Sequence, residues 1–385
     1  MIYFDNAAST RALPEVAELF SRLLLDVYAN PASGSRLAME GEKILKESAN
    51  TLVSCIHAQS GEEIFFTSGG TESNNWAVFG TAKGYHRSGK HVLTTQVEHP
   101  AIRLPFEELA KEGFEVEFLP VDERGKVDVE TVKNAVRPDT ILVSTIFINN
   151  ETGTINDIEA IGKAIKEKNP DTIYHVDAVQ GFGKAPIHVQ RAKIDLLSAS
   201  GHKFHAPKGL GFLYRKKGLR VKPLMFGGGH QQGQRPGTEN VAGAAALALA
   251  AKESYANLEA HHAPVLEVKR TLAEGILQME GTHLNGDTLE NASPYVLNIR
   301  FDGLRGPVLL NALEDKGIFA SAGSACNTKK KTHSAVLGAM GLTEEEITGA
   351  LRFSFCRMNT IEEAEACVKA LEELVPMLRR FNRKR

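Results

Sequence analysis

The sequence predicts an α/β protein with a large domain, built on a mostly parallel seven-stranded sheet wrapped by helices, and a smaller α+β domain. Between residue 60 and about residue 215, apolar strand-like runs alternate with helix-like segments, which is typical of parallel sheets covered by helices. The run TILVSTIFIN, residues 140–149, is predominantly apolar, as in a strand buried on both faces. After about residue 250 the pattern changes to mixed helices and short strands.

Seven strand-like runs define the predicted sheet, at residues 62–68, 91–97, 114–121, 140–149, 172–178, 194–200 and 211–216. The helices predicted between them cover residues 71–86, 100–113, 128–136 and 158–169. A helical stretch is then expected over 242–277, followed by strand-like or helical runs at 294–301, 307–317, 318–323 and 351–357 and by a last helix over 360–381. We therefore expect a large cofactor-binding domain over residues 12–250 and a small domain made of residues 1–11 and 251–385.

Composition and charge exclude several classes of function. The 385 residues suffice for a large core, and a formal net charge of -2 gives no basic field for nucleic acid. The apolar stretch from Val241 is too short to span a bilayer, and the N-terminus lacks the features of a secretory signal. The four cysteines show neither paired nor metal-ligand spacing, which indicates free thiols, a cytoplasmic location and no metal site: Cys55, Cys326, Cys356 and Cys367.

Residues that follow the predicted strands are the first candidates for a site, because ligands bind beyond the carboxyl ends of parallel strands. The segment TSGGTESNN, residues 67–75, offers Gly69 and Gly70 for a tight turn and Thr71 at the start of a helix. Backbone N–H groups at such a helix start bind phosphate well. A simple helix cap with a glycine turn is the plainer interpretation of this segment taken alone.

Polar residues follow the other strands as well. They are His99, Asn149, Asn150, Asp177, Gln180, Ser200, His202 and Lys203. Each has an ordinary structural explanation as a turn, a cap or a helix start. Lys203 stands among small and apolar residues, however, and desolvation lowers the pKa of an amine and activates it as a nucleophile. Lys208 lies in a Pro-Lys-Gly turn and is expected at the surface.

Taken together, these residues suit pyridoxal 5'-phosphate. The cofactor needs a helix start for its phosphate, a carboxylate at its ring nitrogen and a lysine at its aldehyde. Asp177 and Lys203 are far enough apart in the sequence to lie on neighbouring strands.

The motifs resemble those of cysteine desulfurases of the iron–sulfur-cluster and nitrogen-fixation type, in the class V aminotransferase group of pyridoxal-phosphate enzymes of fold type I. They run in the family's order over nearly the whole chain: YFDNAAST, NPASGSR, FTSGGTESNN, EHPAI, NNETG, HVDAVQ, SGHKFHAPKGLG, GGGHQQGQRPGTEN, SAGSACN and LRFSF. The resemblance implies a PLP-dependent enzyme that converts L-cysteine to L-alanine and a persulfide on Cys326. The sulfur would supply iron–sulfur clusters or other sulfur-containing cofactors.

The resemblance also implies individual roles. Lys203 bonds the cofactor aldehyde, Asp177 pairs with the ring nitrogen, and His99 stacks on the ring and takes part in proton transfer. Gln180 binds the phenolic oxygen. The implied phosphate ligands are Gly70, Thr71, Ser200, His202 and, from the other subunit, Thr238, which implies a homodimer. Asn150 is implied to contact the cofactor. It is also implied to bind the substrate carboxylate, together with Asn30 and Arg352; the planar guanidinium of Arg352 suits that task.

Cys326 lies in ASAGSACNT, residues 320–328, a run of small residues that predicts a loop bearing a reactive thiol. Cys55, Cys356 and Cys367 fit the commoner case of a buried small apolar residue. The three lysines at 329–331 would lower the pKa of the thiol, attract an acidic sulfur-acceptor protein, or only form a solvated basic loop. The family usually has small or apolar residues there, so the acceptor stays open.

Two kinds of rival remain. One is a related enzyme with the same cofactor, either a selenocysteine lyase or a class V aminotransferase, and the latter has no need of Cys326. The other is a non-catalytic cofactor-binding protein, which has no need of Lys203 and Cys326 together. Yellow colour that borohydride discharges, with alanine and sulfide formed from cysteine, discriminates among them.

Overall fold

The computed structural model describes residues 1–256, 258–322 and 334–382. Its strands are β1 (Ile2–Tyr3), β2 (Ile64–Thr67), β3 (His91–Thr95), β4 (Glu115–Leu119), β5 (Thr140–Ile146), β6 (Ile173–Asp177), β7 (Leu196–Ser200), β8 (Gly211–Arg215), β9 (Thr282–Asn285), β10 (Val296–Phe301), β11 (Ile318–Phe319) and β12 (Ala350–Ser354). Its helices are α1 (Pro14–Asp26), α2 (Ala38–Ile56), α3 (Gly70–Tyr85), α4 (Pro100–Lys111), α5 (Val129–Ala135), α6 (Ile158–Lys168), α7 (Val241–Ala256), α8 (Leu258–Leu277), α9 (Gly306–Glu314), α10 (Ala335–Ala339), α11 (Glu344–Thr348) and α12 (Ile361–Asn382).

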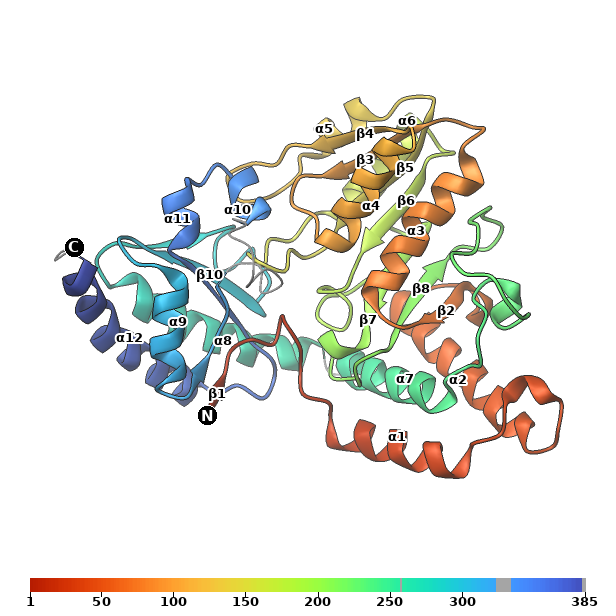
Figure 1. Ribbon diagram of the computed structural model, residues 1–385, viewed down its shortest axis with the longest axis horizontal. Helices are drawn as coiled ribbons and strands as arrows, with labels where there is room; N and C mark the ends of the chain where they lie inside the picture. The colour runs from red at the N-terminus through yellow and green to blue at the C-terminus, as the bar shows by residue number, and fades with distance from the viewer. Residues whose placement is uncertain (257, 323–333, 383–385) are drawn as a thin grey trace.

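The large sheet has seven strands in the order β2-β8-β7-β6-β5-β3-β4, which confirms the predicted architecture. The strands β7, β6, β5, β3 and β4 are parallel neighbours, whereas β8 is antiparallel to both β7 and β2. Because five parallel strands end at the same edge, the residues that follow them converge in space. Figure 1 shows this sheet with helices on either side of it.

Helices cover both faces of the large sheet, as the apolar strand sequences predict. On one face, Leu142, Leu196 and Leu213 pack with residues of α3 and α4. On the other face, their neighbours in sequence pack with residues of α2, α6 and α7: Val143, Leu197 and Phe212. Successive strand residues therefore serve opposite cores, which is the period of two expected of a pleated strand.

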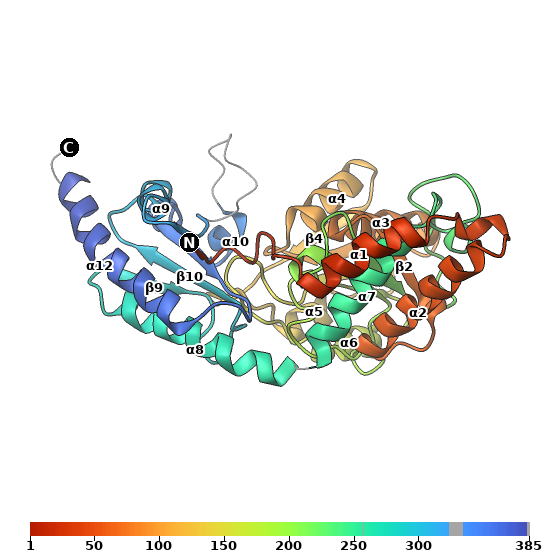
Figure 2. The same ribbon diagram turned by 90° about the horizontal axis from the view of Figure 1, so that it is seen from below.

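A second sheet and a second core occupy the other half of the molecule (Figure 1). β12, β10 and β9 form an antiparallel sheet, and α8 and α12 pack on it side by side, as Figure 2 shows from below. β1 pairs in parallel with β11, so the first residues of the chain lie in this half. Among the described residues, no helix combines the length and apolar character needed to cross a membrane.

The predicted helical stretch 242–277 consists of two helices. α7 contributes Ala246, Leu247 and Ala250 to the core of the large sheet, whereas α8 contributes Val265 and Leu272 to the second core. The composition of α7 explains why most of its residues are buried, because a helix with apolar side chains on all its faces is stable only when protein covers it.

Candidate active site

A cavity of about 330 Å³ lies beyond the carboxyl ends of β5, β6 and β7. Most of the predicted site residues line it, namely Gly70, Thr71, His99, Asn150, Asp177, Gln180, Ser200, His202, Lys203 and Arg352. Ala7, Ala8, Asn74 and Glu151, which the sequence analysis did not select, line it as well. The structure thus brings together side chains from both sheets and from the N-terminal segment.

Lys203 ends the short 3-10 turn Gly201–Lys203 that directly follows β7. Its Nζ donates hydrogen bonds to the carbonyl oxygens of Ala7, at 2.6 Å, and Ala8, at 2.9 Å. Glycine suits position 201, because a Cβ there would lie 2.7 Å from Leu247 Cδ1, 3.0 Å from Ala206 Cβ and 3.3 Å from the carbonyl oxygen of Leu210. Lys208 is exposed, as predicted for the surface turn. The amine at the cavity is therefore the one that the sequence selected.

Asp177 is the last residue of β6 and is only 2% exposed. Its Oδ2 accepts a hydrogen bond from Asn74 Nδ2 at 2.7 Å, and its Oδ1 accepts one from the backbone N–H of Val179 at 2.9 Å. Burial raises the pKa of this carboxyl, while His99 and Lys203 oppose the rise. A cation bound in the cavity would complete the pairing of this carboxylate.

Two histidines line the cavity in their neutral form. His99 caps α4, and its Nδ1 accepts the backbone N–H of Ala101 at 3.1 Å, so the neutral ring carries its proton on Nε2. Burial lowers the pKa of His99, although Asp177 acts in the opposite direction. Burial and nearby lysines lower the pKa of His202 to about 4. Both rings can therefore donate a hydrogen bond at neutral pH without carrying charge.

The start of α3 forms a cradle of backbone N–H groups. Gly69 precedes the helix at φ 147°, and no side chain caps the first turn. A Cβ on Gly70 would lie 2.6 Å from Val179 Cγ2 and 3.4 Å from Ser200 Cβ, so only glycine fits this close approach. Uncapped N–H groups at the start of a long helix attract an anion, and a phosphate suits them.

Arg352 reaches the cavity from β12 and is 3% exposed. Its Nη2 donates to Asp5 Oδ1 at 2.7 Å and its Nη1 to the carbonyl oxygen of Asn150 at 3.0 Å. Among the residues that the structure describes, its Nε finds no hydrogen-bond partner, and neither do Asn150 Oδ1 and Asn74 Oδ1. Buried polar atoms are rarely left unsatisfied, so this cluster of three around one cavity indicates a polar ligand.

Two buried acids stand beside these residues. Glu151 lines the cavity and accepts a hydrogen bond from Ser334 Oγ at 2.5 Å, and burial raises its pKa. Glu98 immediately precedes His99 and accepts hydrogen bonds from Thr95 Oγ1 at 2.7 Å and from the Ile146 N–H at 2.8 Å. Burial raises the pKa of Glu98 to about 8, and the charge of Asp177 acts in the same direction.

Three predicted site residues are not part of this cavity as the structure describes it. Asn30 is exposed and caps the 3-10 turn Pro31–Ser33 by accepting the N–H of Ala32 at 3.0 Å. Thr238 is exposed and lies outside the lining of the cavity. Cys326 falls outside the described residues. The other three cysteines are unpaired and buried, which confirms their interpretation as small apolar residues: Cys55, Cys356 and Cys367.

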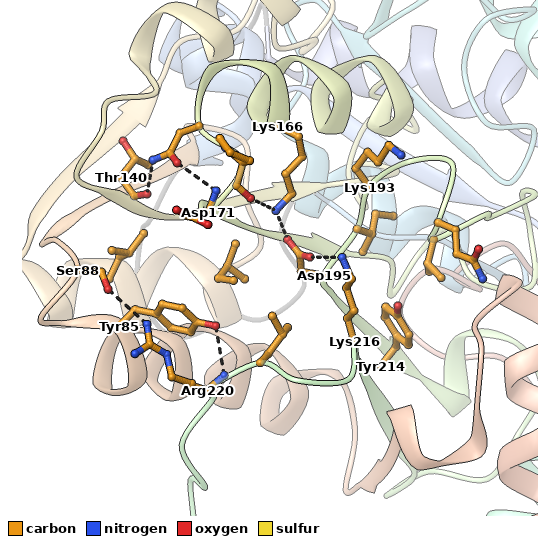
Figure 3. Close-up of a pocket in the computed structure, with 18 of the residues that line it drawn as sticks. Tyr85, Ser88, Thr140, Lys166, Asp171, Lys193, Asp195, Tyr214, Lys216 and Arg220 are labelled. Carbon is orange, nitrogen blue, oxygen red and sulfur yellow. Dashed lines mark hydrogen bonds and ion pairs between the residues drawn. The ribbon is translucent and has the colours of Figure 1, made fainter.

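A larger pocket of about 700 Å³ lies at the opposite, amino end of the strands (Figure 3). At its centre, Asp195 Oδ2 accepts hydrogen bonds from Lys166 Nζ at 2.5 Å and from the Tyr174 N–H at 3.0 Å, and Lys216 Nζ lies 3.6 Å from Oδ1. Arg220 stacks over the ring of Tyr85 at 4.7 Å. None of the predicted site residues that the structure describes lines this pocket.

Comparison with known proteins gives consistent results. The aminotransferase class-V family matches residues 2–367. The chain is 40% identical over 381 residues to a cysteine desulfurase IscS of Methanosarcina thermophila, covering 99% of this chain and 93% of that protein. It is 39% identical over 383 residues to a cysteine desulfurase IscS of Clostridium botulinum, covering 99% and 96% of the two chains.

Solved structures agree with these relatives. A NifS-like protein superposes with a TM-score of 0.92 at 35% identity, covering 98% of this chain and 100% of that one. A structure described as SspA in complex with cysteine superposes with a TM-score of 0.82 at 32% identity, covering 93% and 99%. The chain therefore belongs to the aminotransferase class-V family and, within that family, to the cysteine desulfurase group.

Proposed function

We propose that this protein is a PLP-dependent cysteine desulfurase that converts L-cysteine to L-alanine and moves the sulfur to Cys326 as a persulfide. One observation carries the proposal: the buried carboxyl group of Asp177 and the amine of Lys203 line one cavity, and the uncapped start of α3 lines the same cavity. The relatives that share almost the whole chain are named cysteine desulfurases. The sulfur would supply iron–sulfur clusters or other sulfur-containing cofactors through an acceptor protein.

The donor set around the cavity fits pyridoxal 5'-phosphate. The start of α3, Ser200 and neutral His202 would hold the phosphate, and Asp177 would hold a proton on the ring nitrogen. When bound, the cofactor supplies an aldehyde for an amine and a ring that accepts electrons. Asn74 keeps Asp177 oriented through its 2.7 Å hydrogen bond, and His99 would cover the ring.

The substrate would be bound by its carboxylate at Arg352 and Asn150. The guanidinium of Arg352 is already held in one orientation, because its Nη1 donates to the backbone carbonyl oxygen of Asn150 and its Nη2 to the Asp5 carboxylate, while its Nε has no partner among the described residues. A planar, charge-assisted contact of this kind suits an amino-acid carboxylate. Lys203 would then remove the Cα proton, and His99 would take part in proton transfer at the substrate thiol. The Cys326 thiolate would then attack the substrate sulfur. The electron pair of the C–S bond that breaks would stay with the substrate carbon, which takes up a proton and becomes the methyl group of alanine.

A homodimer would complete the site and explain the two distant residues. Several large apolar side chains are exposed near the N-terminal helices and at residue 226: Leu24, Leu25, Tyr28, Leu37, Met39 and Phe226. Large exposed apolar patches mark interaction surfaces, and these side chains are candidates for one. We propose that a second copy covers them and that Thr238 and Asn30 act at this interface.

We also propose the domain division expected from the sequence, with residues 12–250 forming one domain and residues 1–11 and 251–385 the other. Two separate apolar cores, one on the large sheet and one on the small sheet, support this division. A cytoplasmic location is proposed on the unpaired cysteines among the described residues, which suit a reducing compartment.

The decisive experiment is mass spectrometry of the protein after brief exposure to L-cysteine, with alanine measured in parallel. We expect the added mass of one sulfur on the peptide that holds Cys326 and none on the peptide that holds Cys356. The Cys326→Ser variant should remain yellow but carry no added sulfur, and the Cys356→Ser variant should behave like the wild type. Sulfur on Cys356 alone would overturn the assignment of Cys326 as the acceptor. Unchanged activity in Cys326→Ser, with no added sulfur in the wild type, would favour an aminotransferase. Yellow protein that forms no alanine would favour a non-catalytic role.

A further inference from the structure

A second lysine, Lys184, is buried directly behind the active-site cavity. It lies in the turn after β6, four residues beyond Gln180, and is 8% exposed. Together with Lys203, Cys356 and Tyr295 it lines a hollow of about 20 Å³, room for about one water molecule. A buried lysine is costly unless its ammonium group is paired or has a function, so this position needs an explanation.

Lys184 is connected to Lys203 by a short chain of hydrogen bonds. Lys184 Nζ donates to Gln180 Oε1 at 2.9 Å, and Gln180 Nε2 donates to the carbonyl oxygen of Ala7 at 2.9 Å. The same carbonyl oxygen accepts a hydrogen bond from Lys203 Nζ at 2.6 Å. Because the Ala7 carbonyl oxygen can only accept and Lys184 donates to Oε1, the two contacts together hold the donor end of the Gln180 amide toward Ala7 and the cavity. Lys184 thus fixes the orientation of a side chain that lines the site.

The charges around Lys184 make its ammonium form unfavourable. Burial, together with the positive charges of Lys203 and Arg352, lowers the pKa of Lys184 to about 7, while Cys356 acts in the opposite direction. Its Nζ lies 5.7 Å from the ring centroid of Tyr295, whose own pKa burial raises to about 12. The remaining titratable groups around the hollow are His205, His261 and Arg357. Electrostatic repulsion is mutual, so a charge on Lys184 also opposes a proton on the Lys203 nitrogen.

We propose that Lys184 is a positioning residue of the desulfurase site, which orients Gln180 and whose positive charge helps to keep the Lys203 nitrogen unprotonated. This inference rests on the proposed bond between Lys203 and the cofactor. Once released from the cofactor, the Lys203 amine must be unprotonated to accept the substrate Cα proton, so a positive charge on Lys184 would favour the competent form. It contacts no substrate in this arrangement and acts only through Gln180 and through its charge.

The test uses the cofactor-loaded protein and three variants. Lys184→Met removes the charge and the hydrogen bond, and Lys184→Arg keeps a charge at every accessible pH. Lys269→Met is the matched control, because Lys269 is also buried, at 1% exposure, and also has a pKa lowered by burial, to about 8. Its Nζ donates to the carbonyl oxygen of Ser293 at 3.0 Å in the second core, away from the cavity.

The measurement is the pH midpoint at which the visible absorbance of the bound cofactor changes, which reports the proton on the Lys203 nitrogen. We expect Lys184→Met to move this midpoint upward by about one pH unit and Lys184→Arg to move it downward. Lys269→Met should leave it unchanged even if it lowers the melting temperature. Equilibrium dialysis should also show weaker cofactor retention in Lys184→Met, by about tenfold, because Gln180 loses its partner.

The two proposals fail in different ways. Equal midpoints in the wild type, Lys184→Met and Lys184→Arg would reduce Lys184 to a structural residue while leaving the role of Lys203 intact. A wild-type protein without a visible band that borohydride discharges would overturn the role of Lys203 and this inference with it. If Lys184→Met does not fold, the midpoint of Lys184→Arg alone still decides, because a permanent charge must lower it.

Discussion

The two ends of the large sheet each carry a pocket, and the proposed active site lies in the smaller one. At the amino end, about 700 Å³ is lined by charged groups that pair with one another, as Asp195 does with Lys166. At the carboxyl end, about 330 Å³ is bordered by side chains whose buried polar atoms lack partners, such as Arg352 Nε and Asn150 Oδ1. Unsatisfied buried polar atoms, and not volume, therefore indicate which of the two pockets binds a polar ligand.

The largest effect in this comparison is expected from Lys203→Ala at the carboxyl end. Without its amine the protein loses both the bond to the cofactor and the base for the Cα proton, so alanine formation should fall by about 10³-fold or more. Borohydride should no longer fix the cofactor to the chain. Steady-state rates and reduction followed by mass spectrometry check this, and substantial residual activity would place the essential amine elsewhere.

Arg352→Gln should have the next largest effect, on substrate binding. Losing a charge-assisted contact to the carboxylate should raise KM for L-cysteine by about 30-fold with a smaller change in kcat. The absorbance of the bound cofactor should stay close to that of the wild type. This control separates weaker substrate binding from a loss of cofactor binding at the start of α3. An unchanged KM would show that the unpartnered Nε does not serve the substrate.

Glu98→Gln sharpens the comparison through the pH dependence of stability. The folded-state pKa of Glu98 is raised to about 8, so the native protein binds a proton that the unfolded chain releases, and wild-type stability falls as pH rises from about 4.5 to about 8. The glutamine side chain does not titrate, so the variant does not lose this part of its folding stability as the pH rises. Its melting temperature relative to the wild type should therefore improve from pH 5 to pH 8.5, measured on the cofactor-free protein. A constant difference across this range would contradict the prediction.

The smallest effect is expected from Lys216→Ala at the amino end. Lys216 is largely exposed and lies 3.6 Å from an Asp195 carboxylate that Lys166 already holds. Exposed ion pairs contribute about 0–1 kcal/mol, so neither stability nor activity should change appreciably. A large loss of desulfurase activity here would mean that the pocket of Figure 3 takes part in the reaction.

The fold was largely predictable because each strand carries its own signal. Runs such as 140–149 and 172–178 contain β5 and β6 entirely, and the carboxyl ends of such strands point to the site residues Asp177 and Asn150. Local sequence specifies these features, since they depend on the strand and on the residue that follows it.

The contacts that the sequence did not reveal join distant segments. Asn74 belongs to the segment TSGGTESNN, in which the glycines carry the sequence signal. Its hydrogen bond to Asp177 joins residues 103 positions apart, so the sequence gives no sign of it. The carbonyl oxygens of Ala7 and Ala8 meet Lys203 across more than 190 residues, and a backbone carbonyl has no sequence signal at all. Lys184 was not selected because a lysine four residues from a glutamine in a turn is ordinary until its burial is known.

The N-terminal segment has a consequence for biosynthesis. Residues made first, Ile2 to Ala7, find their partners in residues made near the end: Ile318, Arg352 and Ser354. A nascent chain on the ribosome can therefore complete its large sheet before Arg352 has been made and before the N-terminal segment, whose carbonyl oxygens accept from Lys203, has its partners. Binding of the cofactor should accordingly follow release of the finished polypeptide from the ribosome. A bulky fusion ahead of residue 2 should therefore slow the formation of the cofactor-loaded protein more than the same fusion at the other terminus.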